Sequence, residues 1–209
     1  MKVLIIGGTG GTGRLIVQEA RDRGHDVVAL VRCKEKAASL GQVQLVQGDA
    51  TDEPTFAAAL EGCDAVISAL GTPMSPFKEV TLLSTATSAL IHAMESQKVP
   101  RLICITGMGA GDSKGHGGFI FDRIFNPLML RKVYVDKDRQ ESLIRSSHLQ
   151  WVIIRPSVLN DKPATGRIRV LTDLSNFHGG SISRADVAKF TVDQLTNDRY
   201  LKLTPLISG

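Results

Sequence analysis

Short apolar runs alternate with longer amphipathic segments from the first residues of the chain onward. Residues 3–6 form a continuous apolar run that ends in glycines, which is typical of a strand buried on both faces of a sheet. Residues 12–23 follow, with Leu15, Ile16 and Ala20 at the spacing of one helix face. This opening predicts a β-strand, a glycine-rich turn and an α-helix.

The same alternation continues through the rest of the chain. It predicts further strands at residues 26–31, 43–47, 65–70, 102–106 and 152–155, with a weaker one at 167–171. Helical patterns lie at residues 54–61, 80–97, 128–147 and 184–196. Strands that alternate with helices pair in parallel through right-handed crossovers. We therefore expect the α/β class: a Rossmann-like doubly wound parallel sheet with helices on both faces.

A single domain is the expected organisation of residues 1–209. The chain is 43% hydrophobic and 22% charged, as is usual for a globular protein, and no linker rich in Pro and Ser divides it. Residues 109–118 contain five glycines and are predicted to form a mobile loop inside that domain. We expect residues 107–185, with approximate bounds, to form a small substrate-side portion around the carboxyl edge of the sheet.

Charge and cysteine usage exclude several classes of protein. The formal net charge of +4 is spread along the chain, without the clustered basic stripe that nucleic-acid binding needs. The apolar runs are shorter than a signal-peptide core or a membrane span, so we expect a cytoplasmic protein that binds no membrane. The three cysteines are expected to be reduced core thiols, and neither they nor the five histidines show metal-ligand spacing.

Residues 7–13 read Gly-Gly-Thr-Gly-Gly-Thr-Gly at the junction between the first predicted strand and helix. Glycine permits the sharp turn and lets backbone N–H groups approach a pyrophosphate, while the N-terminus of the helix adds partial positive charge. A plain structural turn can use the same residues, but here a strand, a helix and a βαβ unit coincide with the loop. The loop is therefore predicted to hold a dinucleotide, with Gly7 among its contacts.

The residue at the end of the second strand selects between dinucleotide cofactors. An Asp or Glu there accepts a hydrogen bond from the ribose of NAD, whereas NADP needs a cation for its 2′-phosphate. Arg32 occupies this position, with Arg14, Lys34 and Lys36 also nearby, so we expect NADP(H). The alternative is that Arg32 is only a solvated charge. Asp49 is predicted to accept from an adenine amino group, although an ordinary loop Asp fits almost as well.

A series of short motifs runs along essentially the whole chain. They are the glycine loop, Leu30-Val31-Arg32, Gly48-Asp49, Ala69-Leu70-Gly71, Lys137-x-x-x-Glu141 and the runs 151–156, 160–166 and 182–188. In this order they resemble the NAD(P)-binding, NmrA-like group of atypical short-chain dehydrogenase/reductases, and within it the biliverdin reductase B (flavin reductase) type. The resemblance places cofactor contacts on Thr9, Gly10, Gly11, Thr12, Gly13, Arg32, Asp49, Leu70, Gly71, Thr106 and Pro156.

The catalytic pattern of that family is incomplete in this sequence. Typical members use Tyr-x-x-x-Lys, in which the Lys lowers the pKa of the Tyr, but Tyr134 and Lys137 are only three positions apart. We expect this offset to move the pair apart and leave Tyr134 as a packing or surface aromatic. The resemblance also implies a Ser beside the nicotinamide, and Gly107 stands at that position. Thr106 keeps a neighbouring hydroxyl and is the candidate catalytic residue.

These losses favour hydride transfer to an acceptor that needs little help with protons. A flavin or quinone can take its proton from water, so we expect an NADPH-dependent reductase of a small planar acceptor. The alternative is an NADP(H)-sensing NmrA-like regulator without turnover, while a sugar-nucleotide epimerase would want the intact Tyr-x-x-x-Lys. We expect residues 109–118 to cover an acceptor pocket, and His116 is the one histidine to test. The pocket would use apolar residues, which more often belong to a protein core: Met108, Phe119, Phe121, Phe125, Pro156 and Val158.

Overall fold

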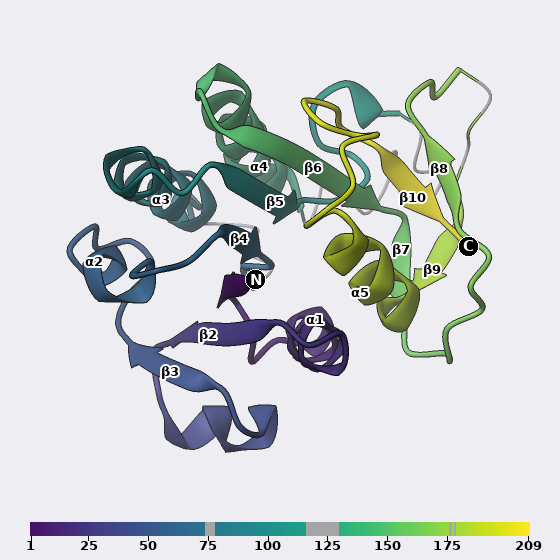
Figure 1. Cartoon of the computed structure of the whole chain (residues 1–209). Coiled ribbons are helices and arrows are strands. Elements are labelled where there is room, and N and C mark those ends of the chain that lie inside the picture. The colour runs from purple at the N-terminus through teal and green to yellow at the C-terminus, as the bar shows by residue number, and fades with distance from the viewer. Residues whose placement is uncertain (74–77, 116–129, 176, 178) are drawn as a thin grey trace.

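The computed structural model describes residues 1–73, 78–115, 130–175, 177 and 179–209, and an eight-stranded sheet forms its centre (Figure 1). The strands of this sheet are β1 (Lys2–Ile6), β2 (Asp26–Val31), β3 (Gln44–Gln47), β4 (Ala65–Ser68), β5 (Arg101–Ile105), β6 (Gln150–Pro156), β8 (Arg169–Leu171) and β10 (Leu206–Ser208). They lie in the order β3-β2-β1-β4-β5-β6-β10-β8. The chain order reverses at β1, which is the kind of switch point beside which doubly wound sheets bind ligands.

Neighbouring strands from β3 to β10 all pair in parallel. Their carboxyl ends therefore lie at one edge of the sheet. The edge strand β8 runs antiparallel to β10, which differs from the wholly parallel sheet expected from the sequence. A hydrophobic pattern does not encode strand direction, and antiparallel edge strands are common in mixed sheets. The prediction of a Rossmann-like doubly wound α/β fold is confirmed.

Helices cover both faces of the sheet, which explains why β1 is apolar throughout. Val3 and Ile5 pack into the core on one face, and Leu4 and Ile6 into the core on the other. The first face carries α1 (Gly11–Asp22) and α5 (Arg184–Asp193), and the second carries α2 (Thr55–Ala59), α3 (Leu82–Gln97) and α4 (Arg131–Ser146), as Figure 1 shows.

The elements predicted from the sequence agree with the structure to within a few residues at each end. The elements that were not predicted are the 3-10 helices η1 (Glu35–Leu40) and η2 (Gly111–Ser113) and the strands β7 (Val158–Asn160), β9 (Ser181–Ser183) and β10. These strands have three residues each, too few for a hydrophobic period to be recognised. β7 and β9 pair with each other in a small parallel sheet of their own.

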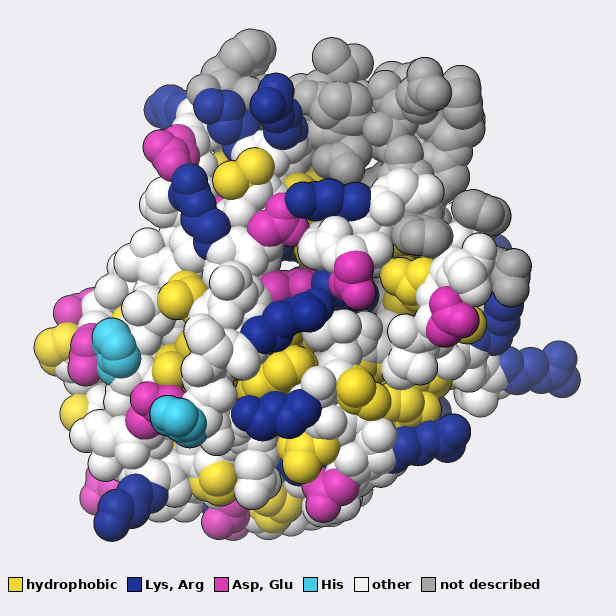
Figure 2. All heavy atoms as spheres, turned by 90° about the horizontal axis from the view of Figure 1, so that it is seen from above, with side chains coloured by type: hydrophobic (Ala, Val, Ile, Leu, Met, Phe, Trp, Pro, Cys, Tyr) yellow, Lys and Arg dark blue, Asp and Glu magenta, His cyan; other side chains and the backbone are white. Residues whose placement is uncertain are grey.

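The face of the molecule seen from above mixes charges of both signs (Figure 2). Seen from above, Lys and Arg side chains are interspersed with Asp, Glu and apolar side chains (Figure 2). No helix in the described part of the chain is long and apolar enough to cross a membrane. Cys33, Cys63 and Cys104 are all free thiols, and the latter two are buried.

Candidate active site

The glycine loop after β1 is folded tightly on itself and against the end of β4. The Gly10 N–H donates a hydrogen bond to the Gly7 carbonyl, 3.0 Å away, and Gly7 has a left-handed φ of +79°. A Cβ on Gly13 would lie 2.1 Å from the Gly7 oxygen, and one on Gly7 would lie 2.5 Å from the Ala69 oxygen. The protein's own backbone therefore excludes side chains at these two positions.

Gly10 and Gly11 are exposed, unlike Gly13, because they stand at the N-terminus of α1. This helix begins directly after Gly10 with no side-chain cap and no acidic residue in its first turn. Its first N–H groups have no partner within the helix, and the helix dipole favours an anion beside them. The Arg14 Nε donates to the Thr9 carbonyl at 3.0 Å and adds a cation to the loop. These residues fit the pyrophosphate of a dinucleotide.

Arg32 and Asp49 lie beyond the ends of β2 and β3, at the same edge. Arg32 is exposed, and its guanidinium makes no hydrogen bond or ion pair with another residue in the described ranges. The Asp49 carboxylate accepts hydrogen bonds from the N–H and the hydroxyl of Thr51, at 2.8 and 2.7 Å, and these bonds lower the pKa of Asp49. Asp49 thus has a role in its own turn, and its contact with adenine stays a prediction.

The remaining predicted contacts follow β4, β5 and β6. Leu70 is half-buried against the core, and Gly71 is exposed with open space where a Cβ would stand. Thr106 follows β5 directly, and Pro156 is the last residue of β6. The structure therefore brings the predicted cofactor residues together along one edge of the sheet, on both sides of the switch point.

A pocket of about 230 Å³ opens where β5 and β6 end beside α4. Three of the predicted acceptor-pocket residues, Met108, Pro156 and Val158, are in its lining. The predicted residues Phe119, Phe121, Phe125 and His116 lie outside the described residues. The rest of the lining consists of Ile105, Thr106, Gly107, Tyr134, Lys137, Ser157 and Leu159.

Tyr134 and Lys137 both reach this pocket from α4. The Tyr134 hydroxyl donates to the Met108 carbonyl at 2.6 Å, and the Lys137 Nζ lies 5.3 Å from the centre of the Tyr134 ring. The expectation that their spacing moves the pair apart is therefore wrong. Residues three positions apart share a helix face just as residues four apart do, so the offset keeps both side chains on one side of α4.

A buried charged cluster lies beneath the pocket and holds Thr106. The Thr106 hydroxyl donates to Glu141 Oε1 at 2.7 Å, and Arg155 donates to both Glu141 oxygens at 3.0 and 2.5 Å. Arg155 also pairs with Asp112 of η2. Burial alone would lower the pKa of Arg155, but the hydrogen bonds and charges of Glu141 and Asp112 raise it. In the sequence, Glu141 and Arg155 belong to two separate motifs, and no local pattern indicates that their side chains form an ion pair.

The first part of the predicted mobile loop, residues 109–115, is hydrogen-bonded to its surroundings. The Gly111 N–H donates to Asp138 Oδ1 at 2.7 Å, and the Lys114 Nζ donates to Asp138 Oδ2 at 2.5 Å. Met108, rather than this segment, contributes to the pocket lining. Asp138 lies on α4 one turn after Tyr134, so the same helix anchors the segment and lines the pocket.

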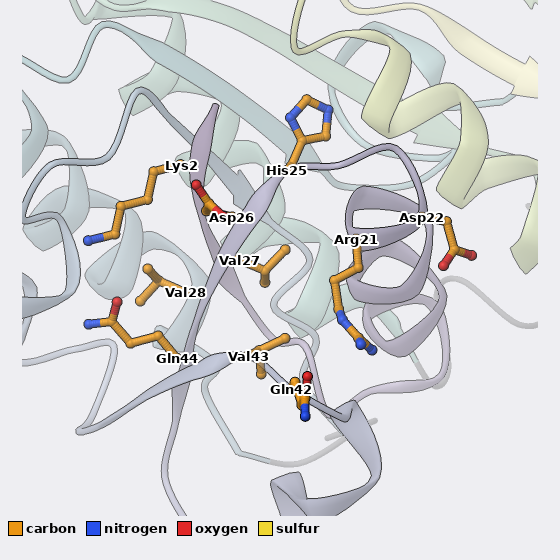
Figure 3. Close-up of a pocket in the computed structure, with 10 residues that line it drawn as sticks. All are labelled: Lys2, Arg21, Asp22, His25, Asp26, Val27, Val28, Gln42, Val43 and Gln44. Carbon is orange, nitrogen blue, oxygen red and sulfur yellow. The ribbon is translucent and has the colours of Figure 1, made fainter.

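A larger hollow of about 720 Å³ lies at the opposite edge of the sheet, at the amino ends of β1, β2 and β3 (Figure 3). Its side chains do not converge: Lys2 and Gln44 lie on one side of β2, and Arg21 and Asp22 on the other (Figure 3). Ligands of doubly wound sheets bind at the carboxyl ends of the strands. The smaller pocket at the ends of β5 and β6, on the same edge of the sheet as the glycine loop, is therefore the better candidate for an active site.

The chain is similar to proteins that are named as an epimerase and as a reductase. A protein of Bacillus subtilis (strain 168) named uncharacterized sugar epimerase YhfK is 32% identical over 98% of this chain and 94% of its own. Among solved structures, ChuY, an anaerobillin reductase from Escherichia coli O157:H7, is 26% identical with a TM-score of 0.82, covering 100% of this chain and 97% of its own.

The same fold appears in more distant structures. The oxidoreductase ylbE from Lactococcus lactis has a TM-score of 0.83 at 22% identity, covering 100% of this chain and 91% of its own, which shows the fold alone. The family model described as NAD(P)H-binding matches residues 7–198, from the glycine loop to beyond α5. A nicotinamide cofactor accounts for the loop geometry described above, and the chain belongs to the NAD(P)H-binding family.

Proposed function

We propose that the protein is an NADPH-dependent reductase that transfers hydride to a small planar acceptor such as a flavin or a quinone. The observation that carries this proposal is the pocket at the ends of β5 and β6, on the same edge of the sheet as the glycine loop. Its apolar residues, including Ile105, Met108 and Leu159, suit the face of a flat ring. The bound nicotinamide supplies a hydride there, and the protein supplies position and polarity.

The choice of NADPH over NADH rests on Arg32. Its exposed guanidinium follows β2, where the ribose of a dinucleotide lies in this fold, and its donors are uncommitted among the described residues. A guanidinium binds a phosphate through two parallel hydrogen bonds. Lys34 and Lys36, two and four residues further on, are also exposed and add to the positive field.

The relatives carry names of both kinds, and the residues of the pocket favour a reductase over an epimerase. ChuY is named a reductase, whereas YhfK is named a sugar epimerase. Epimerases of this superfamily rely on a Tyr that exchanges a proton with the substrate. Here the Tyr134 hydroxyl donates its hydrogen to the Met108 carbonyl and is three positions, rather than four, from Lys137.

The second candidate function, an NADP(H)-sensing regulator, is favoured by Gly107. A glycine provides no side-chain donor where the resemblance implies a Ser. Such a regulator would bind the same cofactor through the glycine loop and Arg32. The two functions therefore share the cofactor site and differ only in whether the pocket beside it turns over an acceptor.

The experiment that tests the proposal compares binding with turnover. NADPH and NADH affinities are measured by fluorescence titration, and NADPH oxidation is then followed with FMN, a quinone and biliverdin at matched concentrations. The proposal expects tighter binding of NADPH than of NADH and oxidation of NADPH by at least one planar acceptor. Gly10→Val, which is expected to lose the cofactor, corrects for uncatalysed oxidation. Tight NADPH binding without oxidation by any acceptor would support the regulator instead.

A further inference from the structure

We propose that Lys137 is the proton donor of the acceptor pocket and takes the place of the hydroxyl that is missing at Gly107. The inference rests on the proposed reductase function and adds a catalytic residue to it. It follows from what occupies the space beside Gly107, from the partners of every hydroxyl in the pocket lining, and from the electrostatics of the Lys137 amine.

The Lys137 amine occupies the space beside Gly107. A Cβ built on Gly107 would lie 3.0 Å from the Lys137 Nζ and 3.8 Å from the Tyr134 hydroxyl oxygen. Gly107 also has a φ of +154°, which side chains rarely adopt. A Ser at 107 would therefore be strained and would crowd the amine. The glycine leaves room for a donor that arrives from α4 rather than from the end of β5.

The hydroxyl groups of the pocket lining have already donated their hydrogens inside the protein. Thr106 donates to Glu141 Oε1 at 2.7 Å, Tyr134 donates to the Met108 carbonyl at 2.6 Å, and Ser157 donates to the Ser208 hydroxyl at 3.2 Å. A hydroxyl has one hydrogen to give. None of these three groups, as arranged here, offers a proton to a ligand in the pocket.

Lys137 differs because its ammonium carries three N–H donors. One of them is donated to the Thr106 carbonyl at 2.5 Å, which fixes the position of Nζ. Nζ also lies 5.3 Å from the centre of the Tyr134 ring, on the pocket side of α4. Its remaining donors are available to an acceptor atom in the pocket, and Lys137 is the described lining residue that combines position with a spare proton.

The surroundings of Lys137 make its proton easy to release. Burial lowers the pKa of Lys137 to about 8, while Cys104 on β5 and Glu141 on α4 act in the opposite direction. Burial raises the pKa of Cys104 to about 12, so this thiol remains neutral, and the Glu141 charge is shared with Arg155 of β6. A donor with a pKa near the working pH is the most effective general acid.

The step balances in atoms and electrons. The acceptor gains two electrons and one proton as a hydride from NADPH, which is oxidised to NADP⁺, and a negative charge remains on the reduced ring of the acceptor. The Lys137 N–H bond then breaks, a new N–H or O–H bond forms at the charged acceptor atom, and Nζ remains as a neutral amine. Water restores the proton to Nζ before the next turnover.

The test is a pH profile of wild type, Lys137→Met and Lys137→Arg with a quinone acceptor, with the NADPH dissociation constant measured at each pH. We expect the wild-type kcat to fall roughly tenfold per pH unit above about pH 8, because only the protonated amine is active. Both variants should lose about 100-fold in kcat and this pH dependence, because neither Met nor Arg releases a proton here. The NADPH dissociation constant should change less than about threefold, since donors elsewhere hold the cofactor. Lys132→Met, an exposed lysine on the same helix, is the matched control and should behave as wild type.

A second readout needs no turnover. In protein labelled with ¹³C at the lysine ε-carbon, the resonance that disappears in Lys137→Met should titrate near pH 8. A titration of that resonance above pH 10 overturns the proposal, as does Lys137→Met with wild-type kcat and pH profile. A variant that loses NADPH affinity but keeps kcat shows a cofactor-holding lysine and also overturns it. If wild type binds NADPH but reduces no acceptor, the reductase function itself fails and this inference fails with it.

Discussion

At the end of β1 the site is built from backbone, whereas at the ends of β5 and β6 it is built from charged side chains. The glycine loop has no side chain at Gly7 or Gly13 because neighbouring carbonyl oxygens occupy the space. The pocket side instead depends on Glu141 and Arg155, which are 2% and 1% exposed, and on the Thr106 hydroxyl between them and the pocket. Gly7 and Gly13 cannot accept a side chain, and the buried pair of Glu141 and Arg155 cannot lose a charge.

This difference also separates stability from binding in the two regions. In the loop, the tightly packed Gly7 and Gly13 maintain the turn, and the exposed Gly10 and Gly11 are predicted to contact the cofactor. In the cluster, the same residues both stabilise the fold and position the pocket, because Glu141 contacts Arg155 and Thr106 at once. A substitution in the loop should therefore affect either stability or cofactor binding, whereas a substitution in the cluster should affect both stability and the position of the pocket residues.

The largest effect is expected from Glu141→Gln. Removing the charge leaves Arg155 buried with Asp112 as its remaining carboxylate, and breaking a buried ion pair costs about 3–5 kcal/mol of unfolding free energy. Urea unfolding followed by circular dichroism measures this. Asp112→Asn touches the same guanidinium from a side chain that is 70% exposed and should cost less than about 1 kcal/mol. Equal losses of unfolding free energy in the two variants would mean that the burial of Glu141 does not determine its contribution to stability.

The next-largest loss of unfolding free energy is expected from Gly13→Ala. Its Cβ would lie 2.1 Å from the Gly7 oxygen, and overpacking of this kind costs about 1–3 kcal/mol of unfolding free energy. A Cβ at Gly10 would lie 3.3 Å from the same oxygen, and φ there is −75°. Gly10→Val should thus keep the unfolding free energy to within about 1 kcal/mol and lose NADPH binding. Micromolar NADPH affinity of Gly10→Val by calorimetry would show a purely structural loop.

Arg32→Ala tests the cation beyond β2. If Arg32 holds the 2′-phosphate, the variant should lose about 1–3 kcal/mol of NADPH binding free energy and almost none for NADH. The melting temperature should not change, because the side chain is exposed. Lys189→Ala, an exposed charge on α5, serves as the control for net charge. An equal loss for both cofactors would rule out the phosphate contact.

A pH trend in stability is expected at Lys137. Its folded-state pKa of about 8 lies below the ordinary lysine value of 10.5, so the unfolded chain binds more protons between these values. Wild-type stability relative to Lys137→Met should therefore rise as the pH increases from 8 to 10.5 and remain constant below 8. Thermal unfolding of both proteins across this range measures the trend. A difference independent of pH would contradict the lowered pKa.

The glycine loop was predictable because its residues are contiguous and each one restricts the backbone locally. The strands and long helices were predictable from their periodicity for the same reason. The cluster was not, because Thr106, Asp112, Glu141 and Arg155 come from separate elements that only the sheet topology brings together. One signal was present: Arg155 follows the apolar run 151–154 within β6, and a buried arginine requires a carboxylate partner.

Tyr134 shows the opposite kind of error. The motif Tyr-x-x-x-Lys requires a spacing of four positions, but side chains three and four positions apart both face one side of a helix. The orientation of Tyr134 follows from its contact with the Met108 carbonyl, which no local pattern encodes. The NAD(P)H-binding family was therefore accessible from the sequence, whereas the placement of Tyr134 and Lys137 in one pocket required the structure.

Strand β10 has a consequence for the order in which the protein acquires its parts during translation. The Ser157 N–H donates to the Ile207 carbonyl, and the Arg155 N–H donates to the Pro205 carbonyl, so the strand that lines the pocket is fixed by residues made about fifty positions later. A nascent chain that has emerged through β5 already holds a dinucleotide turn. Its β6 edge, by contrast, stays apolar and unpaired until β10 leaves the ribosome, and an unpaired edge is a template for aggregation. A cofactor that is present during synthesis would thus meet an intermediate that has the glycine turn but in which the pocket at the ends of β5 and β6 is not yet complete.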